Sequence, residues 1–334
     1  MTIRIGKISL WHVHAWDYIR QAEQHEETVL AAVWDENAER GKEAAERLDV
    51  PFFPELGTML AQEDLQAVIV DAPTRLHREV IVAAAKAGKH IFTEKVLAPT
   101  LAETNEILAA VREHGVKLTV SLPRLNEGYT LKTLDILQQG LLGKITHVRA
   151  RLSHNGAIGE WLPEHFYSLE DCLGGALIDL GCHPMYLAKL FLGEEVTGVQ
   201  ANFGYVTGKE VEDNAVVTLF TESGAIGVVE AGFVNSHSPF TIEIHGTEGS
   251  LLYGTPEAKL LIRTNNGPEA YREWTEIPLP ERKESAFNQW VSHILNDTQA
   301  VDNVDMAVEL TRLMEASNIS AKEGRKISLH ELQA

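Results

Sequence analysis

Short apolar runs alternate with longer amphipathic stretches through the first third of the chain. The apolar runs are typical of buried strands, and the amphipathic stretches are typical of helices that cross over between parallel strands. Strands are expected at residues 3–8, 28–34, 67–70, 91–93 and 117–121, and helices at residues 15–23, 38–48, 77–87 and 101–114. Because such crossovers are right-handed, this order predicts a doubly wound parallel sheet with helices on both faces.

The pattern changes after Pro123. Beyond a helix expected at 131–141, apolar residues alternate with polar ones, as in antiparallel strands that bury one face. These strands are expected at residues 146–152, 197–204, 214–221, 225–231, 240–245, 249–253 and 326–329, with further helices at 176–192 and 304–323. The chain has 334 residues, more than the about 250 to 300 that one core supports. The sequence therefore predicts an α/β domain at 1–122 and an α+β domain at 123–334.

The acidic balance of the chain limits its partners. Its net charge is -19, with 48 acidic against 29 basic residues, and this charge repels a nucleic-acid backbone. No run of about 18 apolar residues is present to span a bilayer, and the first residues read as a strand rather than a leader. A cytoplasmic protein without membrane contact is expected. Cys172 and Cys182 are too few for a disulfide framework or a thiolate metal site, so they are interpreted as small buried residues.

The turn after the first expected strand lacks the glycines usual for a dinucleotide-binding loop. This turn normally reads G-x-G-x-x-G, because glycine lets the backbone approach the pyrophosphate. Here the three glycine positions hold Ser9, Trp11 and His14. We expect Ser9, Leu10, Trp11 and His12 to contact a cofactor in an altered phosphate cradle. Two alternatives stay open: the loop only caps a helix, or Trp11 is only a core residue.

The second expected strand ends at an acidic residue, Asp35. A carboxylate at this position accepts both hydroxyls of an adenosine ribose and repels a 2'-phosphate. NAD is therefore favoured over NADP as the cofactor, although the nearby Arg40 leaves NADP open. The alternative is that Asp35 and the residues after it form a solvated turn and helix cap.

Polar residues also follow the third and fourth expected strands, at the edge where open α/β sheets bind ligands. Pro73, Thr74 and His77 follow the third strand, and Glu94 and Lys95 follow the fourth. A Glu-Lys pair in isolation is usually a weak surface ion pair. At the mouth of a sheet, however, a lysine can hold the oxygen of a reacting alcohol and stabilise the alkoxide.

Asp179 and His183 lie four residues apart in a glycine-rich, otherwise apolar helix. This spacing places both side chains on one face of an α-helix. Histidine is suited to moving protons near neutral pH, and a nearby carboxylate can orient it. The alternatives are a buried structural Asp-His pair and a metal-binding pair; no second close-set pair of ligands stands out among the 14 histidines, so no metal site is expected.

Segments 74–77, 88–95 and 174–183 together resemble the Gfo/Idh/MocA family of glucose-fructose oxidoreductases and inositol dehydrogenases. Members of that family carry a Glu-Lys-Pro motif after the fourth strand, and this chain has Val96 in place of the proline. The resemblance implies a Rossmann domain followed by an α+β domain whose open sheet covers the active site. It also implies a homodimer or homotetramer formed through that sheet.

The resemblance further implies a hydride-transfer mechanism on a sugar, cyclitol or related polyol. His183 would take a proton from a substrate hydroxyl, Lys95 would hold that oxygen, and Asp179 would position the pair. Asp35 would hold the cofactor ribose. The groups expected to line the cofactor groove are Pro73, Thr74, His77 and Glu94.

Polar and aromatic side chains after the first domain are candidate substrate contacts, since a hydroxylated ring is bound by hydrogen-bonding and aromatic groups. They are Arg124, Asn126, His154, Asn155, Trp161 and His165. Two other functions stay open. One is a lyase or glycosidase that retains NAD and oxidises its substrate transiently, and the other is a non-catalytic relative that binds a sugar or nucleotide.

Overall fold

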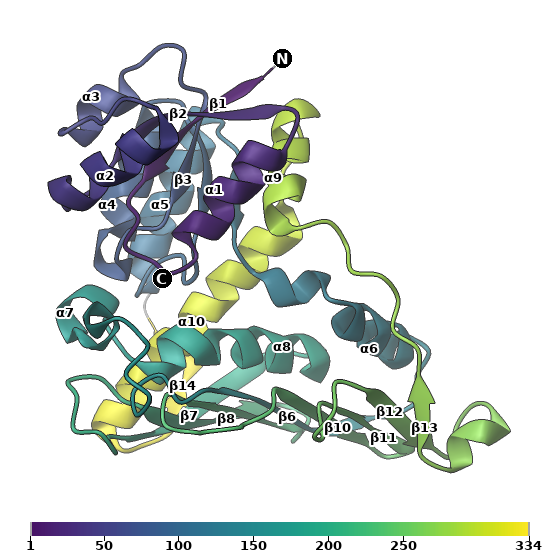
Figure 1. Ribbon diagram of the computed structural model, residues 1–334. Coiled ribbons are helices and arrows are strands. Elements are labelled where there is room, and N and C mark those ends of the chain that lie inside the picture. The colour runs from purple at the N-terminus through teal and green to yellow at the C-terminus, as the bar shows by residue number, and fades with distance from the viewer. Residues whose placement is uncertain (1, 333–334) are drawn as a thin grey trace. The chain divides into compact units, whose positions relative to one another are not determined.

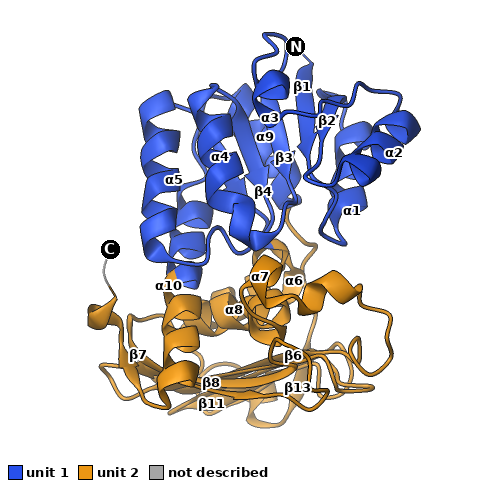
Figure 2. Ribbon diagram, turned by 90° about the vertical axis from the view of Figure 1, so that its left-hand side faces the viewer, with its two compact units in different colours: residues 1–122, 284–311, 334 blue, residues 123–283, 312–333 orange. Residues whose placement is uncertain are grey.

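The computed structural model describes residues 2–332, which form two compact units (Figure 2). The first unit contains residues 2–122 together with Glu284–Thr311, and the second contains Pro123–Lys283 together with residues 312–332. The first change of unit, between Leu122 and Pro123, falls at the boundary expected from the sequence. The assignment of all residues after 122 to one domain is wrong for Glu284–Thr311, which belong to the first unit.

A parallel five-stranded sheet forms the centre of the first unit (Figure 1). Its strand order is β2-β1-β3-β4-β5, and a single parallel bridge between Val33 and Phe52 extends it beyond β2. The strands are β1 Ile3–Ile8, β2 Thr28–Trp34, β3 Ala67–Val70, β4 His90–Thr93 and β5 Leu118–Val120. The order places a topological switch between β1 and β3, where ligands of such sheets bind at the carboxyl ends of the strands.

Local signals in the sequence start and end the helices of this unit. Asn37 accepts hydrogen bonds from two backbone amides at the start of α2, and Thr100 accepts one at the start of α5. Gly115 ends α5 in the left-handed region, at φ 64°. The helices are α1 Ala15–Gln24, α2 Ala38–Leu48, α3 Leu56–Leu60, α4 His77–Lys86 and α5 Leu101–His114. All but the short α3 were expected.

A helix from late in the sequence completes the core of the first unit. Phe287 and Trp290 of α9, Ala286–Leu295, are both 0% exposed. Their rings lie 5.6 and 5.8 Å from the ring of Phe92 in β4. Asn303, in α10 Val301–Glu323, bonds through its side chain to both the N–H and the C=O of Val120. These contacts are the reason why Glu284–Thr311 belong with the first unit.

The second unit is built on a nine-stranded sheet, as the alternating pattern predicts. Its order is β13-β12-β11-β10-β6-β9-β8-β7-β14; β6 and β9 are parallel, and the other neighbours are antiparallel. The strands are β6 Ile145–Ser153, β7 Val196–Gly204, β8 Asn214–Thr221, β9 Ile226–Gly232, β10 Thr241–Gly246, β11 Gly249–Tyr253, β12 Leu260–Thr264, β13 Thr275–Ile277 and β14 Ile327–Ser328. β12 and the edge strand β13 were not expected.

Helices cover one face of this sheet, and α8 packs on β6 and β9 (Figure 1). They include α6 Gly128–Gln138, α7 Leu169–Cys172 and α8 Cys182–Leu192, the last preceded by a π-helical turn, η4 Leu177–Gly181. Nine of the eleven residues of α8 are buried, so this helix forms the centre of the core. Within residues 2–332, every helix is too short or too polar to cross a membrane.

Candidate active site

The turn between β1 and α1 uses its backbone amides internally. Ser9 takes the left-handed conformation, φ 64°, that glycine adopts more easily. The Leu10 N–H donates to Asp35 Oδ2 at 2.8 Å, and the Trp11 N–H donates to Ser9 Oγ at 3.1 Å. The His12 N–H donates to the backbone oxygen that follows β3, at 3.2 Å. Amides that normally face a pyrophosphate are therefore bonded to the protein, which agrees with the expectation of an altered cradle.

Asp35 lies at the carboxyl end of β2 and is 3% exposed. Besides the Leu10 amide, it accepts the Asn37 N–H at 2.7 Å and two guanidinium N–H groups of Arg40, at 2.9 and 2.7 Å. Arg40 also contacts Glu36 at 2.5 Å. Burial lowers the pKa of Arg40, but its bonds to Asp35 and Glu36 outweigh burial and raise it. Asp35 thus lies where a cofactor ribose is expected, and it is already hydrogen-bonded to the Arg40 guanidinium.

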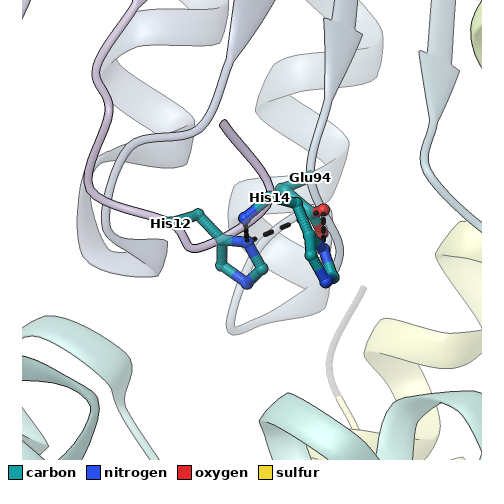
Figure 3. Close-up of side chains that lie close together, drawn as sticks. All are labelled: His12, His14 and Glu94. Atoms are coloured by element: carbon teal, nitrogen blue, oxygen red, sulfur yellow. Dashed lines mark hydrogen bonds and ion pairs between the residues drawn. The ribbon is translucent and has the colours of Figure 1, made fainter. Parts of the chain in front are cut away.

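Glu94 is the centre of a buried polar network at the carboxyl end of β4. It is 1% exposed, and its Oε1 lies 2.9 Å from His14 Nδ1 and 3.7 Å from His12 Nδ1. Figure 3 shows both rings beside the carboxylate. The Tyr18 hydroxyl donates to Glu94 Oε1, and the Lys95 N–H donates to Oε2 at 2.9 Å. Burial would raise the pKa of Glu94, but the two histidines and Lys95 hold it well below its usual range.

Segment 71–77 after β3 serves mainly to hold the backbone. His77 is 1% exposed, and its ring nitrogens lie 2.8 Å from the Val96 oxygen and 3.0 Å from the Ala72 oxygen. His77 therefore fastens the chain just beyond Lys95 to the turn after β3 instead of presenting its ring to a groove. Pro73 is buried and Thr74 is half-buried. The peptide bond between Lys95 and Val96 is cis.

Asp179 and His183 of the second unit lie on either side of the junction between η4 and α8. A π-helical turn is wider than an α-helical one, so the simple four-residue spacing rule does not describe their positions. His183 is 7% exposed, and its Nδ1 lies 3.0 Å from the hydroxyl of Tyr186. That hydroxyl accepts the Arg124 N–H at 3.1 Å. Tyr186 thus connects the predicted base His183 to the predicted substrate residue Arg124. The sequence analysis did not identify Tyr186.

Three predicted substrate residues form one cluster in the second unit. Trp161 Nε1–H donates to Asn155 Oδ1 at 3.0 Å, and the rings of Trp161 and His154 lie 4.5 Å apart. The Trp161 side chain is 55% exposed. The neighbouring His154 is partly buried, and this burial lowers its pKa, although the charge of Asp179 acts in the opposite direction. An exposed indole beside hydrogen-bonding groups is suited to packing against a hydroxylated ring.

The other predicted substrate residues have structural contacts of their own. The Arg124 guanidinium lies 4.1 Å from the ring centre of Phe240 and donates to the Tyr129 hydroxyl at 3.1 Å. Asn126 accepts the Lys283 N–H through its backbone oxygen, and the His165 oxygen accepts the Cys172 thiol. The Arg124 side chain is thus held by two aromatic residues, and the other two contacts engage backbone oxygens. Substrate contact by these residues stays a prediction.

Two family models match the chain. A model of the oxidoreductase family with an NAD-binding Rossmann fold matches residues 5–122, and a model of the GFO/IDH/MocA C-terminal domain matches residues 130–252. The chain belongs to the Gfo/Idh/MocA family. Its first unit is therefore an NAD-binding Rossmann domain, and the expected resemblance is confirmed.

Curated relatives of this Gfo/Idh/MocA protein include enzymes of sugars and cyclitols. Myo-inositol 2-dehydrogenase of Thermotoga maritima is 25% identical and matches over 99% of each chain. D-apiose dehydrogenase of Paraburkholderia graminis is also 25% identical, over 99% of this chain and 90% of that protein. A solved levoglucosan dehydrogenase with NADH and levoglucosan has a TM-score of 0.83 at 20% identity, covering 98% of this chain and 100% of that one. A 3-ketoreductase of Actinomadura kijaniata with TDP-benzene and NADP has a TM-score of 0.79 at 22% identity, covering 96% and 98%.

A buried ion pair beneath the Gfo/Idh/MocA dinucleotide turn was not anticipated. Lys7 in β1 pairs with Asp71 after β3, and both side chains are 0% exposed. Burial lowers the pKa of Lys7 well below its usual value, while the carboxylates of Asp35 and Glu94 act in the opposite direction. A lysine inside an apolar strand gives no local sign of its partner, so only the pairing of β1 with β3 reveals the contact.

Glu212 is a second unanticipated group, in the second unit. Its carboxylate accepts the Gly175 N–H at 2.8 Å and the Leu177 N–H at 2.9 Å, at the start of the helix that carries Asp179. Burial raises the pKa of Glu212 to about 7. A side chain on Gly175 would collide with the Glu212 backbone oxygen, which explains one glycine of the segment before Asp179.

Proposed function

We propose that this protein transfers a hydride between a nicotinamide cofactor and a secondary hydroxyl or ketone of a sugar, cyclitol or related polyol. Family membership supports an oxidoreductase with an NAD-binding domain. The named relatives act on inositol and apiose, which are hydroxylated compounds of this class. The observation that carries the proposal is the chain of hydrogen bonds from Arg124 through Tyr186 to His183, which orients an imidazole at the start of a buried helix.

The geometry around His183 supports its role as the base. For Nε2 to accept a substrate proton, Nδ1 must carry the ring proton and donate it to the Tyr186 oxygen, 3.0 Å away. Burial raises the pKa of Tyr186 well above its usual value, so this phenol stays neutral and serves as a fixed partner. Asp179 would stabilise the imidazolium, and Lys95 would hold the substrate oxygen.

The residues of the first unit fit a dinucleotide. Ser9 provides the left-handed turn, and Asp35 provides a carboxylate where a ribose is expected. We propose NAD as the preferred cofactor, because Asp35 and Glu36 already engage Arg40 and leave a net negative charge that repels a 2'-phosphate. The bound nicotinamide would supply the hydride acceptor or donor; Leu10, Trp11, His12 and Thr74 would contact the nucleotide.

The first experiment is calorimetric titration of NAD and NADP into protein stripped of any resident cofactor. Asp35→Asn should weaken NAD binding by about tenfold or more, since one hydrogen bond to a charged group contributes about 1.5 to 3 kcal/mol. Asp49→Asn is the matched control: this exposed residue ends α2 at φ 53°, a conformation that asparagine tolerates. Failure of the stripped protein to bind either nucleotide would refute the proposal.

Turnover on a panel of sugars and cyclitols tests the catalytic roles. His183→Asn should lower kcat by about 10² to 10⁴-fold and leave the NAD dissociation constant unchanged. Turnover unaffected by both His183→Asn and Lys95→Met would contradict the assigned roles. A homodimer or homotetramer through the sheet of the second unit and a cytosolic location stay predictions; analytical ultracentrifugation tests the first.

A further inference from the structure

Two imidazoles and a carboxylate meet at the turn between β1 and α1 (Figure 3). One ligand atom from each of His12, His14 and Glu94 lies within 4.8 Å of the others. Glu94 and the histidines are about a quarter of the chain apart in sequence, so the contact arises from the fold and not from a local motif. The hydride chemistry proposed above does not require two histidines here.

The donor set is that of a transition-metal site. Imidazole nitrogens and a carboxylate oxygen bind Zn²⁺ and similar ions at about 2.0 to 2.2 Å, which places tetrahedral ligand atoms about 3.3 to 3.5 Å apart. His12 Nδ1 and Glu94 Oε1 are 3.7 Å apart, and His14 Nδ1 and Oε1 are 2.9 Å apart. Each separation needs to change by only about 0.5 Å to reach this spacing. We propose that His12, His14 and Glu94 bind one divalent first-row transition-metal ion.

Groups behind the cluster hold the carboxylate in place, as outer contacts do in metal sites. The Tyr18 hydroxyl donates to Glu94 Oε1 and lies 2.6 Å from Ser121 Oγ. The Lys95 N–H fixes the second oxygen of Glu94. Binding has two identifiable costs. The His14 N–H donates to His12 Nδ1 at 3.2 Å, and His14 Nδ1 lies in hydrogen-bond contact with Glu94 Oε1 at 2.9 Å; the ion replaces both bonds.

The cluster is closed on one side and open on the other. The His12 and Glu94 side chains are 7% and 2% exposed, whereas the His14 side chain is 41% exposed and provides a route for the ion. Three protein ligands leave a fourth position for water or for an anionic ligand. With neutral imidazoles the ion changes the local charge from -1 to +1. An ion here would attract an anionic group, such as a cofactor phosphate, to a turn whose own backbone amides are already hydrogen-bonded within the protein. Only this attraction of a cofactor depends on the proposed function.

The test is titration of Zn²⁺ into tag-free, chelator-treated protein without nucleotide, with Co²⁺ absorption as a second probe of coordination. We expect one Zn²⁺ per chain with a micromolar or tighter dissociation constant. His14→Gln and Glu94→Gln should each weaken it by about 100-fold or more, the scale expected when a ligand is lost. His114→Gln, an exposed histidine of α5 in the same unit, is the matched control and should leave it unchanged.

Two outcomes would overturn the proposal. One is no Zn²⁺ binding tighter than that of the His12→Asn, His14→Gln double variant, and the other is a stoichiometric site that survives both single changes. If Glu94→Gln fails to fold, the partly exposed His14→Gln decides the question. Because nucleotide is absent, loss of NAD binding would refute the proposed function and leave the metal site intact, so the two failures are distinguishable.

Discussion

Removing one member of the buried Lys7–Asp71 pair should destabilise the first unit strongly. Both side chains are 0% exposed, so the remaining charge is not hydrated when its partner is lost. Breaking a buried pair from one side costs about 3 to 5 kcal/mol, whereas replacing both members by apolar residues is often neutral. Lys7→Met and Asp71→Leu should therefore each be costly, and the double variant should recover most of the loss.

The expected shift is large enough for a thermal assay. For a unit of about 150 residues, 1 kcal/mol lowers Tm by about 2 to 4 °C, so each single variant should lose about 6 to 20 °C. Tryptophan fluorescence reports mainly on the first unit, which contains four of the 6 tryptophans: Trp11, Trp16, Trp34 and Trp290. Circular dichroism at low temperature confirms that each variant folds.

An exposed ion pair in the same unit is the control. Arg4 and Asp64 lie 2.9 Å apart, with side chains 43% and 63% exposed. Their removal should cost less than about 1 kcal/mol. The reasoning fails if the Lys7 and Asp71 single variants shift Tm no more than this control, or if the double variant loses the sum of the two single losses.

Three further predictions concern single residues. Because the pKa of Glu212 is raised to about 7 from 4.5, the folded state holds this proton more tightly than the unfolded state. The free energy of unfolding should therefore fall by about 3 kcal/mol as pH rises from about 4.5 to 7. Urea unfolding of Glu212→Gln should lack this pH-dependent component. Tyr18→Phe removes the hydroxyl that donates to buried Glu94 and should cost about 2 kcal/mol; an unchanged urea midpoint would contradict the role of that bond. Gly175→Ala should destabilise by about 1 to 3 kcal/mol through collision with a backbone oxygen, whereas a Cβ at Gly174 comes no closer than 3.1 Å to its nearest neighbour, the Ile178 side chain. Equal Tm values of the two variants would refute the collision.

Local patterns were sufficient for most of the fold. The strands and crossover helices of the first unit follow from apolar runs that match short buried strands, with caps such as Asn37 and Gly115 marking the helix ends. The position of α9 was not predictable, since its Phe287 and Trp290 pack on a strand almost two hundred residues earlier. No local signal says to which core an amphipathic helix returns.

In the candidate site, too, local patterns predicted individual residues but not their long-range contacts. Asp35, Glu94, Lys95 and His183 were predicted from their places after strands and in a glycine-rich helix. The partners that define their chemistry, such as the Tyr186 hydroxyl on His183, depend on which elements the fold brings together. Hydrogen bonds between distant segments leave no periodic trace in a sequence.

The late return of the chain through α9 affects how the protein is made. A ribosome that has released residues 2–122 has not yet supplied Phe287 and Trp290, which are 0% exposed in the finished core. At about 5 to 20 residues per second, α9 follows about 10 to 30 seconds later. During that interval the ring of Phe92 lacks its neighbours from α9, and residues 123–283 of the second unit emerge before these neighbours arrive. The first unit is thus incomplete until most of the second has been made, and a chain ended at residue 122 would be a poor substitute for the Rossmann domain.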